Sequence, residues 1–576
     1  MIEKICPKCR VPMAGDKCIK PGCGCITEVS STIYWCDNCN VPTFESDCPL
    51  CGGSCKYIAT DLRPVFPEEN MLLSIIISGN PYEYMDKSVW YGSNSYFIQG
   101  NRIKFSVSKV NNLPDSEIEK IRNLYNENKN RINYIFFDEL IDKFVRANVD
   151  RYNYITEEAI SYLQGYRDKY SVEDMMVSFS GGKDSTVTSH IVNKAFGTNK
   201  ILHIFGDTTL EFPFTLEYKK RFTGNDESKG IRILTAKNRE KNFEELCKIV
   251  GPPSRVMRWC CTVFKTGAIQ KTISSAFKDK SNILSFQGIR RNESVSRSKY
   301  ERESESPKIS KQTVVSPIID WMDYDVWLYI LTTGIDFNYA YRLGWTRVGC
   351  WCCPNNGGWS EFLSKIHMAD QYNHWHSLLV EFANQIGKPD PEEYVAQGGW
   401  KARQGGNGLA AAQTSIVKFE PCATDEKAFN YDLQKPISDE LYELFKPFGY
   451  INKELGNKRL GEVYVLDAKG NPQLVLQGRI GSTRLKVIIK NVHIAKAKTL
   501  SVAETKIQCQ LTKYQMCLGC KACESVCKYD SISVKDDGNG NIAYSIDDKK
   551  CKRCTECVSH FNAGCYMRKV LGIKRS

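Results

Sequence analysis

The stretch Val177-Ser178-Phe179-Ser180-Gly181-Gly182-Lys183-Asp184-Ser185 decides the fold of the central part of this chain. It joins the end of an apolar run, Met175–Ser180, to a helical pattern over Asp184–Ala195. The glycines allow a tight turn, so that backbone amides at the start of the helix face an anion. The serines and the lysine add hydroxyl and ammonium donors. The stretch therefore predicts a strand, a phosphate-binding loop and a helix, in that order.

Further short apolar runs indicate the sheet to which this loop belongs. They lie over Lys200–Gly206, Ile231–Thr235 and Asn282–Gly288, with helical patterns between them. Strands that alternate with helices form parallel sheets covered on both faces. We therefore expect an α/β core with a doubly wound parallel sheet over residues 151–360. Asp207 follows the second strand, at the edge where such sheets bind ligands, and its carboxylate is expected to hold Mg²⁺ or a ribose.

Five further motifs follow the loop in order, and with them the region resembles the N-type ATP pyrophosphatases, within them the phosphoadenylylsulfate (PAPS) reductase family. The motifs are His203-Ile204-Phe205-Gly206-Asp207-Thr208-Thr209-Leu210-Glu211-Phe212-Pro213, Arg258-Trp259-Cys260-Cys261, Gly288-Ile289-Arg290 with Arg297, Pro317-Ile318-Ile319-Asp320-Trp321 with Asp325-Val326-Trp327, and Gly349-Cys350-Trp351-Cys352-Cys353-Pro354. The resemblance covers roughly residues 150–360.

The resemblance implies an adenine-nucleotide site with Mg²⁺ and ATP as ligands. The residues expected to bind the nucleotide are Ser180, Gly181, Gly182, Lys183, Ser185, Asp207, Glu211, Arg290 and Arg297. The residues expected to act in catalysis are Lys183, Asp184, Asp207 and Arg290. Arginine suits a phosphate or sulfate because its fork of N–H donors matches the oxyanion. A solvated loop is the alternative for the two arginines.

The intact loop distinguishes between two chemistries. Sulfonucleotide reductases resemble this fold but commonly have a degenerate loop and a Glu-Cys-Gly-x-His tail, for which Glu556-Cys557-Val558-Ser559-His560 is the nearest string here. The sequence therefore favours cleavage of ATP to AMP and pyrophosphate. This would activate an acceptor for sulfur transfer, as in relatives that modify tRNA or the DNA backbone. The alternatives are reduction of adenylylsulfate or PAPS to sulfite, and a non-catalytic nucleotide sensor or scaffold.

The 26 cysteines are clustered, ten before residue 56 and nine after residue 508. No export signal precedes them, and CxxC pairs in a reducing compartment indicate metal sites. Residues 1–60 hold few large apolar residues, so metal is expected to supply their folding energy. Two zinc ribbons are predicted, one with Cys6, Cys9, Cys18 and Cys23 and the other with Cys36, Cys39, Cys48 and Cys51. The zinc ribbons either contact a nucleic acid or another partner, or they have a structural role alone.

The C-terminal cysteines follow the spacing of bacterial ferredoxins, in which the fourth cysteine of each run binds the other cluster. One [4Fe-4S] cluster is therefore expected on Cys517, Cys520, Cys523 and Cys565, and a second on Cys527, Cys551, Cys554 and Cys557. Neither Cys527 nor Cys565 is followed by proline, and the gap between Cys557 and Cys565 is longer than the usual three residues. Zinc is the alternative metal.

A third [4Fe-4S] cluster is expected in the core. Cys260 and Cys261, with Cys350 and Cys353, resemble the cysteine pattern of adenylylsulfate reductases that hold a cluster beside the nucleotide. Zinc or free thiols are the alternatives, and Cys352 is left as an extra thiol. Clusters of this kind imply redox chemistry. The sequence does not identify the electron donor or the sulfur donor.

The remaining segments complete the expected organisation. We expect a mixed α+β region over residues 61–150, a helical extension with a Gly-rich loop over 361–435, a basic β-rich region over 436–508 and a ferredoxin-like domain over 509–576. The segment Ala468–Ala503 lacks Asp and Glu, and the net charge is +12. These features allow a nucleic-acid partner, tRNA or DNA. With no apolar run longer than about Met71–Ile77, we expect no membrane span and a cytoplasmic location.

Overall fold

The computed structural model describes residues 3–572 except 7, 8, 10, 11, 14, 16, 26, 31, 225–229, 295, 306–311, 537–540, 562 and 563. The chain forms two compact units. The first comprises Met1–Gly206, Leu210–Thr235 and Thr272–Tyr372, and the second comprises Asp207–Thr209, Ala236–Lys271 and Asn373–Ser576. Among the described helices, none has the length and apolar character needed to span a membrane.

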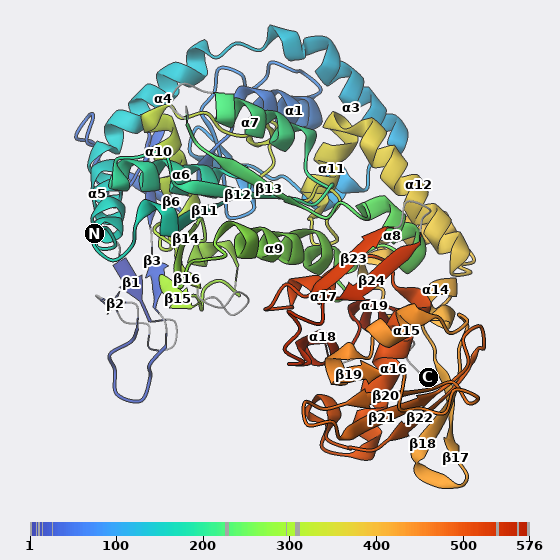
Figure 1. Cartoon of the computed structure of the whole chain (residues 1–576). Coiled ribbons are helices and arrows are strands. Elements are labelled where there is room, and N and C mark those ends of the chain that lie inside the picture. Colours follow the sequence, from blue (N-terminus) through green and yellow to red (C-terminus); the bar gives the residue numbers. More distant parts are fainter. Residues whose placement is uncertain are drawn as a thin grey trace. The chain divides into compact units, whose positions relative to one another are not determined.

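A six-stranded sheet forms the centre of the first unit (Figure 1), in the order β13-β12-β11-β14-β16-β15. Its strands are β11 (Met175–Phe179), β12 (Leu202–Asp207), β13 (Ile233–Lys237), β14 (Ile283–Gln287), β15 (Glu303–Glu305) and β16 (Gln312–Val315). β11 pairs in parallel with β12 and with β14, and β14 pairs in parallel with β16. β15 is antiparallel at one edge. The predicted α/β fold with a parallel sheet is confirmed.

The strand order reverses between β11 and β14, which is where sheets of this class bind ligands. The helices of this part are α5 (Val149–Gln164), α6 (Lys183–Phe196), α7 (Pro213–Gly224), α9 (Gly267–Ala276), α10 (Asp323–Thr333) and α11 (Gly358–His367). α6 begins after Gly182, which has extended backbone angles, and ends at Gly197 in the left-handed conformation. Val187 and Ile191 of α6 are fully buried in the same core as Phe286 of β14.

Residues 61–150 share that core. This region contains a sheet in the order β10-β9-β8-β7. Its elements are β7 (Arg63–Pro64), α1 (Pro67–Ser78), β8 (Val89–Gly92), β9 (Ser95–Ile98), β10 (Asn101–Arg102), α2 (Val107–Asn111), α3 (Asp115–Asn128) and α4 (Ile135–Ala147). Leu72 of α1 and Ile118 of α3 belong to the same hydrophobic cluster as Val177 of β11. The region is therefore packed onto the α/β part of the unit.

The two cysteine modules each contain a small sheet. The first has β1 (Glu3–Ile5), β2 (Pro12–Met13) and β3 (Glu28–Ser30), and the second has β4 (Ile33–Cys36), β5 (Val41–Thr43) and β6 (Lys56–Ala59). Trp35 of the second module is fully buried in a cluster with Phe144 of α4 and Tyr324 of α10. The second module is thus anchored by apolar packing as well as by cysteines, which its sparse apolar content did not predict.

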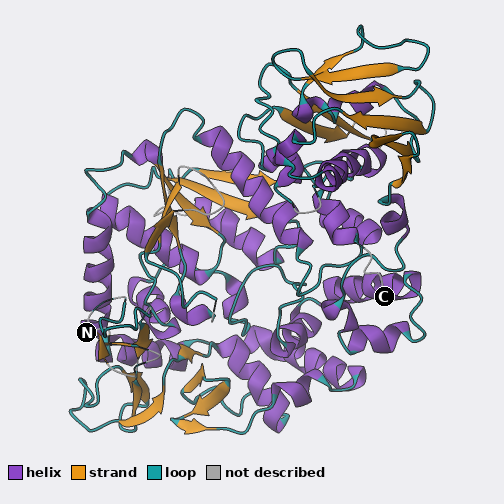
Figure 2. Ribbon diagram, turned by 90° about the horizontal axis from the view of Figure 1, so that it is seen from below, coloured by secondary structure: helices purple, strands orange, loops and turns teal. Residues whose placement is uncertain are grey.

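The second unit contains a six-stranded antiparallel sheet, drawn in orange in Figure 2, in the order β17-β18-β22-β21-β20-β19. Its strands are β17 (Lys418–Cys422), β18 (Asp425–Asp432), β19 (Tyr450–Asn452), β20 (Glu462–Leu466), β21 (Pro472–Gln477) and β22 (Arg484–Ile489). Its other elements are α8 (Phe243–Val250), α12 (Ala369–Gln385), α13 (Pro391–Ala396), α14 (Ala410–Thr414), α15 (Asp439–Glu443), α16 (Leu500–Met516), α17 (Ala522–Ser525), β23 (Ile532–Asp536), β24 (Ile542–Ile546), α18 (Glu556–Ser559) and α19 (Tyr566–Leu571).

One hydrophobic core joins the antiparallel sheet to the cysteine-rich end of the chain. Leu474 and Val487 of the sheet lie in the same cluster as Ile507 of α16, Ile532 of β23 and Val558 of α18. The glycine-rich segment before α14, expected as a loop, packs closely too. A Cβ atom at Gly405 would stand 2.2 Å from the carbonyl oxygen of Gly572, so only glycine fits there.

Candidate nucleotide site and metal centres

The phosphate-loop sequence forms the predicted strand–loop–helix, and its serines close the loop. Ser185 Oγ donates to Gly182 O at 2.8 Å, and it lies 3.1 Å from Ser180 Oγ. Gly181 has φ +71°, a conformation that other residues rarely adopt. A Cβ atom at Gly288, just after β14, would stand 2.6 Å from Asp184 O. Glycine is thus required at both positions for the two strand ends to meet beside the loop.

Two cations and two carboxylates alternate beside this loop. Lys183 Nζ lies 3.1 Å from Asp323 Oδ1 and 3.6 Å from Asp184 Oδ2. Arg290 joins the same carboxylates, with Nη2 at 2.7 Å from Asp323 Oδ1 and Nε at 2.5 Å from Asp184 Oδ1. Lys183 is 3% exposed and Arg290 is 4% exposed. Both predicted cations are therefore neutralised by carboxylates of the chain itself.

The electrostatics favour the charged forms of Lys183 and Asp323. Burial acts to lower the pKa of Lys183, but Asp184 and Asp323 outweigh burial and raise it above its ordinary value. Burial acts to raise the pKa of Asp323, but Lys183 and Arg290 outweigh it and lower that pKa. Each buried charge thus depends on its neighbours, as expected where desolvation is large.

Asp61 is a fifth charged residue at this site. It follows β6 of the second cysteine module, and its carboxylate accepts the backbone N–H groups of Asp323 at 3.0 Å and Tyr324 at 2.9 Å. Asp61 thereby caps the N-terminus of α10, which Asp323 opens. Burial, followed by repulsion from Asp323, raises the pKa of Asp61 to about 7.

The sequence analysis missed Asp61, Asp323 and Tyr341. Tyr341 is 3% exposed, and its hydroxyl accepts the backbone N–H of Lys183 at 3.0 Å. Asp323 follows the matched motif that ends at Trp321, so its place near the site had a signal in the sequence. Asp61 and Tyr341 had none, because they come from segments far from the loop along the chain.

Three further residues were predicted to bind the nucleotide, and each has a different partner in the structure: Arg297, Glu211 and Asp207. Arg297 is half-buried and forms an ion pair with Glu293, and Arg347 and Asp184 both lie within its electrostatic range. Glu211 forms an isolated antiparallel bridge with Cys350. Asp207 belongs to the second unit, where its carboxylate lies 3.0 Å from Lys237 Nζ and accepts the N–H of Thr209. The first unit alone therefore brings together the loop, Arg290 and Arg297.

The N-terminal cysteines converge in the two predicted sets, Cys6, Cys9, Cys18 and Cys23, and Cys36, Cys39, Cys48 and Cys51. The Sγ–Sγ distances are 3.6 Å for Cys6–Cys23 and 3.5 Å for Cys36–Cys51. Four sulfurs about 2.3 Å from a tetrahedral zinc ion stand about 3.8 Å apart, so both sets fit zinc. A hydrogen bond from the backbone of Gly53 lowers the pKa of the Cys51 thiol to about 7, which favours the thiolate that zinc requires.

The two C-terminal cysteine runs repeat one backbone conformation. Gly519 and Lys521, which flank Cys520, have φ +67° and +56°, and Arg553 and Thr555, which flank Cys554, have φ +52° and +61°. A short helix follows in each run, α17 in the first and α18 in the second. Positive φ in three residues other than glycine is rare, so the shared turn indicates a shared structural requirement.

The cysteines of the two runs lie close to one another in the second unit, and the two predicted clusters remain a prediction. One cavity is lined by Cys527, Cys551, Cys554 and Cys557, which come from both runs. Burial raises the pKa of the Cys517, Cys520 and Cys565 thiols, and the neighbouring Cys523 raises each of the three further. Four thiols around a cavity suit a cluster, which is larger than a single ion.

Cys260 and Cys261 lie in the second unit, whereas Cys350 and Cys353 lie in the first. Trp259 is fully buried and stacks on Phe243 of α8 with ring centroids 5.4 Å apart. A π-helical turn, η4 (Cys261–Thr266), starts at the second cysteine, and such turns are frequent at functional sites. Cys260, Cys261 and Cys520 all lie within electrostatic range of Tyr566. The four-cysteine set of the core remains a prediction.

The basic stretch Ala468–Ala503 has no acidic residue in its sequence, but carboxylates of other segments lie beside it in the fold. Asp432 of β18 stands opposite Arg484 of β22, with 3.9 Å between Oδ1 and Nε. Lys496 Nζ lies 3.8 Å from Glu556 Oε1. Arg484 and Lys496 therefore each face a carboxylate from a neighbouring segment, which reduces the local positive potential at these two positions.

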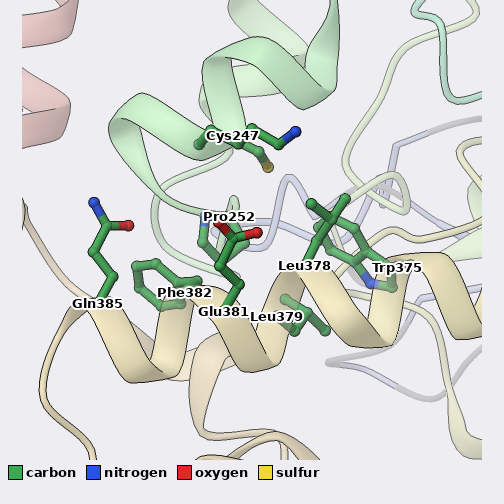
Figure 3. A pocket seen from close by; sticks show the side chains of 9 residues that line it. Cys247, Pro252, Trp375, Leu378, Leu379, Glu381, Phe382 and Gln385 are labelled. Atoms are coloured by element: carbon green, nitrogen blue, oxygen red, sulfur yellow. The ribbon is translucent and has the colours of Figure 1, made fainter.

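An apolar cavity of about 330 Å³ lies between α8 and α12 of the second unit. Figure 3 shows Cys247 of α8 and Trp375 and Phe382 of α12 around it. Burial raises the pKa of the Cys247 thiol, so this cysteine is not an activated nucleophile. None of the residues predicted to bind nucleotide or metal lines this cavity.

Sequence comparisons agree with the geometry of the loop. Residues 174–356 match the model of the phosphoadenosine phosphosulfate reductase domain. An uncharacterised protein of Methanocaldococcus jannaschii is 31% identical over 300 residues, which are 51% of this chain and 60% of that protein. The chain thus spans about 60% of the length of the first curated relatives that it matches.

Several other relatives have the names of enzymes or enzyme subunits. An adenosine 5'-phosphosulfate reductase of Bacillus mycoides is 24% identical, covering 34% of this chain and 80% of that protein. A sulfate adenylyltransferase subunit 2 of Methylorubrum populi is 27% identical, covering 27% of this chain and 55% of that protein.

Among solved structures, the phosphoadenylyl-sulfate reductase of Candida auris in a phosphate complex aligns with a TM-score of 0.26 and 17% identity, over 34% of this chain and 95% of that one. The resemblance expected from the loop and its motifs is confirmed, and the N-terminal cysteine sets fit zinc ribbons. Residues 174–356 of this chain thus match the phosphoadenosine phosphosulfate reductase domain, and two N-terminal cysteine sets of the same chain could hold metal ions.

Proposed function

We propose that this protein binds ATP with Mg²⁺ at the loop Ser180–Ser185 and cleaves it to AMP and pyrophosphate, to activate an acceptor for sulfur transfer. The observation that carries this proposal is the pair of carboxylates, Asp184 and Asp323, that share Lys183 and Arg290 beside the loop. Carboxylate oxygens are the protein ligands that Mg²⁺ prefers, so the donor set fits this ion.

The charge balance favours a metal-bound nucleotide. With Asp184 and Asp323 ionised, the two buried cations have no surplus charge to offer a bare phosphate or sulfate. Mg²⁺ held by those carboxylates would supply that charge and orient the phosphates. Lys183 and Arg290 would then be released from their ion pairs and could donate to phosphate oxygens.

The chain's own residues have separate tasks in this reaction. The loop amides and the hydroxyls of Ser180 and Ser185 would hold the phosphates at the start of α6. The acceptor oxygen would form a bond to the α-phosphorus and release its proton to solvent, while the bond from that phosphorus to the bridging oxygen of the β-phosphate breaks and pyrophosphate leaves with the electron pair. Attack of the sulfur donor on the adenylated acceptor would then break the bond from the acceptor to that oxygen, and AMP would leave with the electron pair. Arg290 and Lys183 would stabilise the negative charge that develops on the leaving pyrophosphate.

The experiment uses anaerobically purified protein with ATP and Mg²⁺, with and without bulk tRNA or DNA. Pyrophosphate and AMP formed in equal amounts by the wild type, with the AMP either free or attached to the acceptor, and lost in Lys183→Ala, would support the proposal. An increase with only one nucleic acid would identify the acceptor class. ATP left intact under every condition would refute it.

A second candidate function is reduction of adenylylsulfate. The relative of Bacillus mycoides has that activity in its name, and Cys260, Cys261 and Cys520 all lie within electrostatic range of Tyr566. This reaction would consume two electrons and release AMP and sulfite. Sulfite formed from adenylylsulfate with a chemical reductant, in a preparation that leaves ATP intact, would favour it.

A further inference from the structure

A lysine is buried between the two C-terminal cysteine runs. Lys513 lies near the end of α16, whose neighbouring residues Leu511 and Tyr514 belong to the core of the second unit. The lysine is 3% exposed. Lysine is almost never fully buried unless its charge is paired, so the position requires an explanation.

The ammonium of Lys513 has a backbone partner. Its Nζ donates to the carbonyl oxygen of Cys557 at 2.8 Å. In the ranges that the structure describes, no carboxylate forms an ion pair with it. A neutral carbonyl does not compensate a buried positive charge, and a second, anionic partner is therefore needed.

As ligands of the proposed clusters, the sulfur atoms of both runs would supply that partner. Lys513 is within electrostatic range of Cys523 and Cys565, which belong to the first predicted cluster, and of Cys557, which belongs to the second. Iron–sulfur clusters are held by thiolates and gain a further negative charge when reduced. One buried cation therefore faces two anionic groups.

We propose that Lys513 is a counter-cation shared by the two C-terminal iron–sulfur clusters and that it raises the reduction potential of both. Each cluster takes up one electron on reduction, with no bond made or broken, and the fixed positive charge stabilises the added electron. The inference rests on the proposed clusters of Cys517–Cys565 and is independent of the nucleotide reaction.

The test is a redox titration followed by electron paramagnetic resonance, with dithionite as reductant. A Cys260→Ser/Cys261→Ser background removes ligands predicted for the core cluster, so that the two C-terminal clusters are observed. Lys513→Met removes the charge, and Lys513→Arg keeps it. Lys528→Met is the matched control, because Lys528 is exposed and adjoins the cluster ligand Cys527.

We expect the equilibrium constant for reduction of each cluster to fall at least tenfold in Lys513→Met, which is about 59 mV for a one-electron couple. Lys513→Arg and Lys528→Met should leave both potentials close to the wild-type values, since an exposed charge is screened by water and salt. If Lys513→Met does not retain iron, Lys513→Gln keeps a donor for the Cys557 carbonyl and is titrated instead.

Three results would overturn the inference. Unchanged potentials in both clusters would show that Lys513 does not act on them, and a shift in one cluster would show that it is not shared. Absence of iron–sulfur signals from the wild-type tail would remove its basis. In that case cleavage of ATP could still be observed, so failure of this inference and failure of the proposed function are distinguishable.

Discussion

Lys183 and Asp323, the first residues of helices α6 and α10, are joined by an ion pair of 3.1 Å. The pair links the phosphate loop to a helix whose N-terminus is held by Asp61 from the second cysteine module. The phosphate loop and the second cysteine module are thereby connected through Lys183, Asp323 and Asp61.

Asp323→Asn should reduce ATP cleavage about 100-fold, the scale found when one fixed electrostatic group is removed from an active site. The change leaves Lys183 and Arg290 with one carboxylate fewer, so the free energy of unfolding should fall by about 3 kcal/mol. Rates of AMP release and thermal unfolding measure the two effects. Asp336→Asn is the control, because Asp336 pairs with Arg221 at the surface. Equal activity of both variants would contradict the role given to Asp323.

Asp61 should make stability depend on pH. Its pKa is raised to about 7, so the folded chain keeps a proton that the unfolded chain releases near pH 4. The free energy of unfolding therefore falls as pH rises from about 4 to 7 and is level above that range.

Asp61→Asn should remove this pH dependence, whatever constant cost its altered hydrogen bonds add. The melting temperatures of wild type and variant are measured from pH 5.5 to 8.5. The advantage of the wild type over the variant should shrink as pH rises to about 7, and the difference should stay constant above that pH. A difference that is constant over the whole range would mean that Asp61 does not titrate there.

Loss of the second zinc site should affect the nucleotide site, whereas loss of the first should not. Cys48→Ser should remove one of two zinc ions, lower the melting temperature and reduce ATP cleavage, because Trp35 and Asp61 connect this module to α10. Cys18→Ser should remove one zinc ion with activity retained. Cys55→Ser is the control, since Cys55 lies outside both sets. Zinc analysis and AMP release give the result, and equal loss of activity in Cys48→Ser and Cys18→Ser would contradict it.

Substitutions in the C-terminal runs should separate the two clusters. Cys554→Ser and Cys527→Ser should each remove about four iron atoms and the same spectroscopic signal, because both cysteines line one cavity. Cys520→Ser should remove the other signal, and Cys422→Ser, outside both runs, should remove none. If Cys527→Ser instead matches Cys520→Ser, the crosswise assignment of the fourth ligands is wrong.

Local features of the sequence predicted the structure well. The strand ending at Phe179, the loop and the helix starting at Lys183 agree with the prediction within one residue, because two glycines and an apolar run fix them over a short distance. The N-terminal cysteines grouped as predicted for the same reason, since each set closes within one short module.

Features that depend on distant segments could not be predicted. Asp61 reaches Asp323 only because the second cysteine module is packed against α10 through Trp35 and Tyr324. Arg484 faces Asp432 because β22 pairs with β18. A positive charge of the basic stretch is therefore paired with a carboxylate of the neighbouring strand. Both depend on the tertiary fold rather than on local spacing.

The measurement that tests the central claim most directly compares ATP and adenylylsulfate in one anaerobic preparation, each labelled in the adenosine moiety. We expect Mg²⁺-dependent formation of pyrophosphate from ATP with an equal amount of AMP, free or attached to the acceptor, lost in Lys183→Ala and reduced about 100-fold in Asp323→Asn. Release of AMP and sulfite from adenylylsulfate alone, without Mg²⁺ and with ATP left intact, would contradict it.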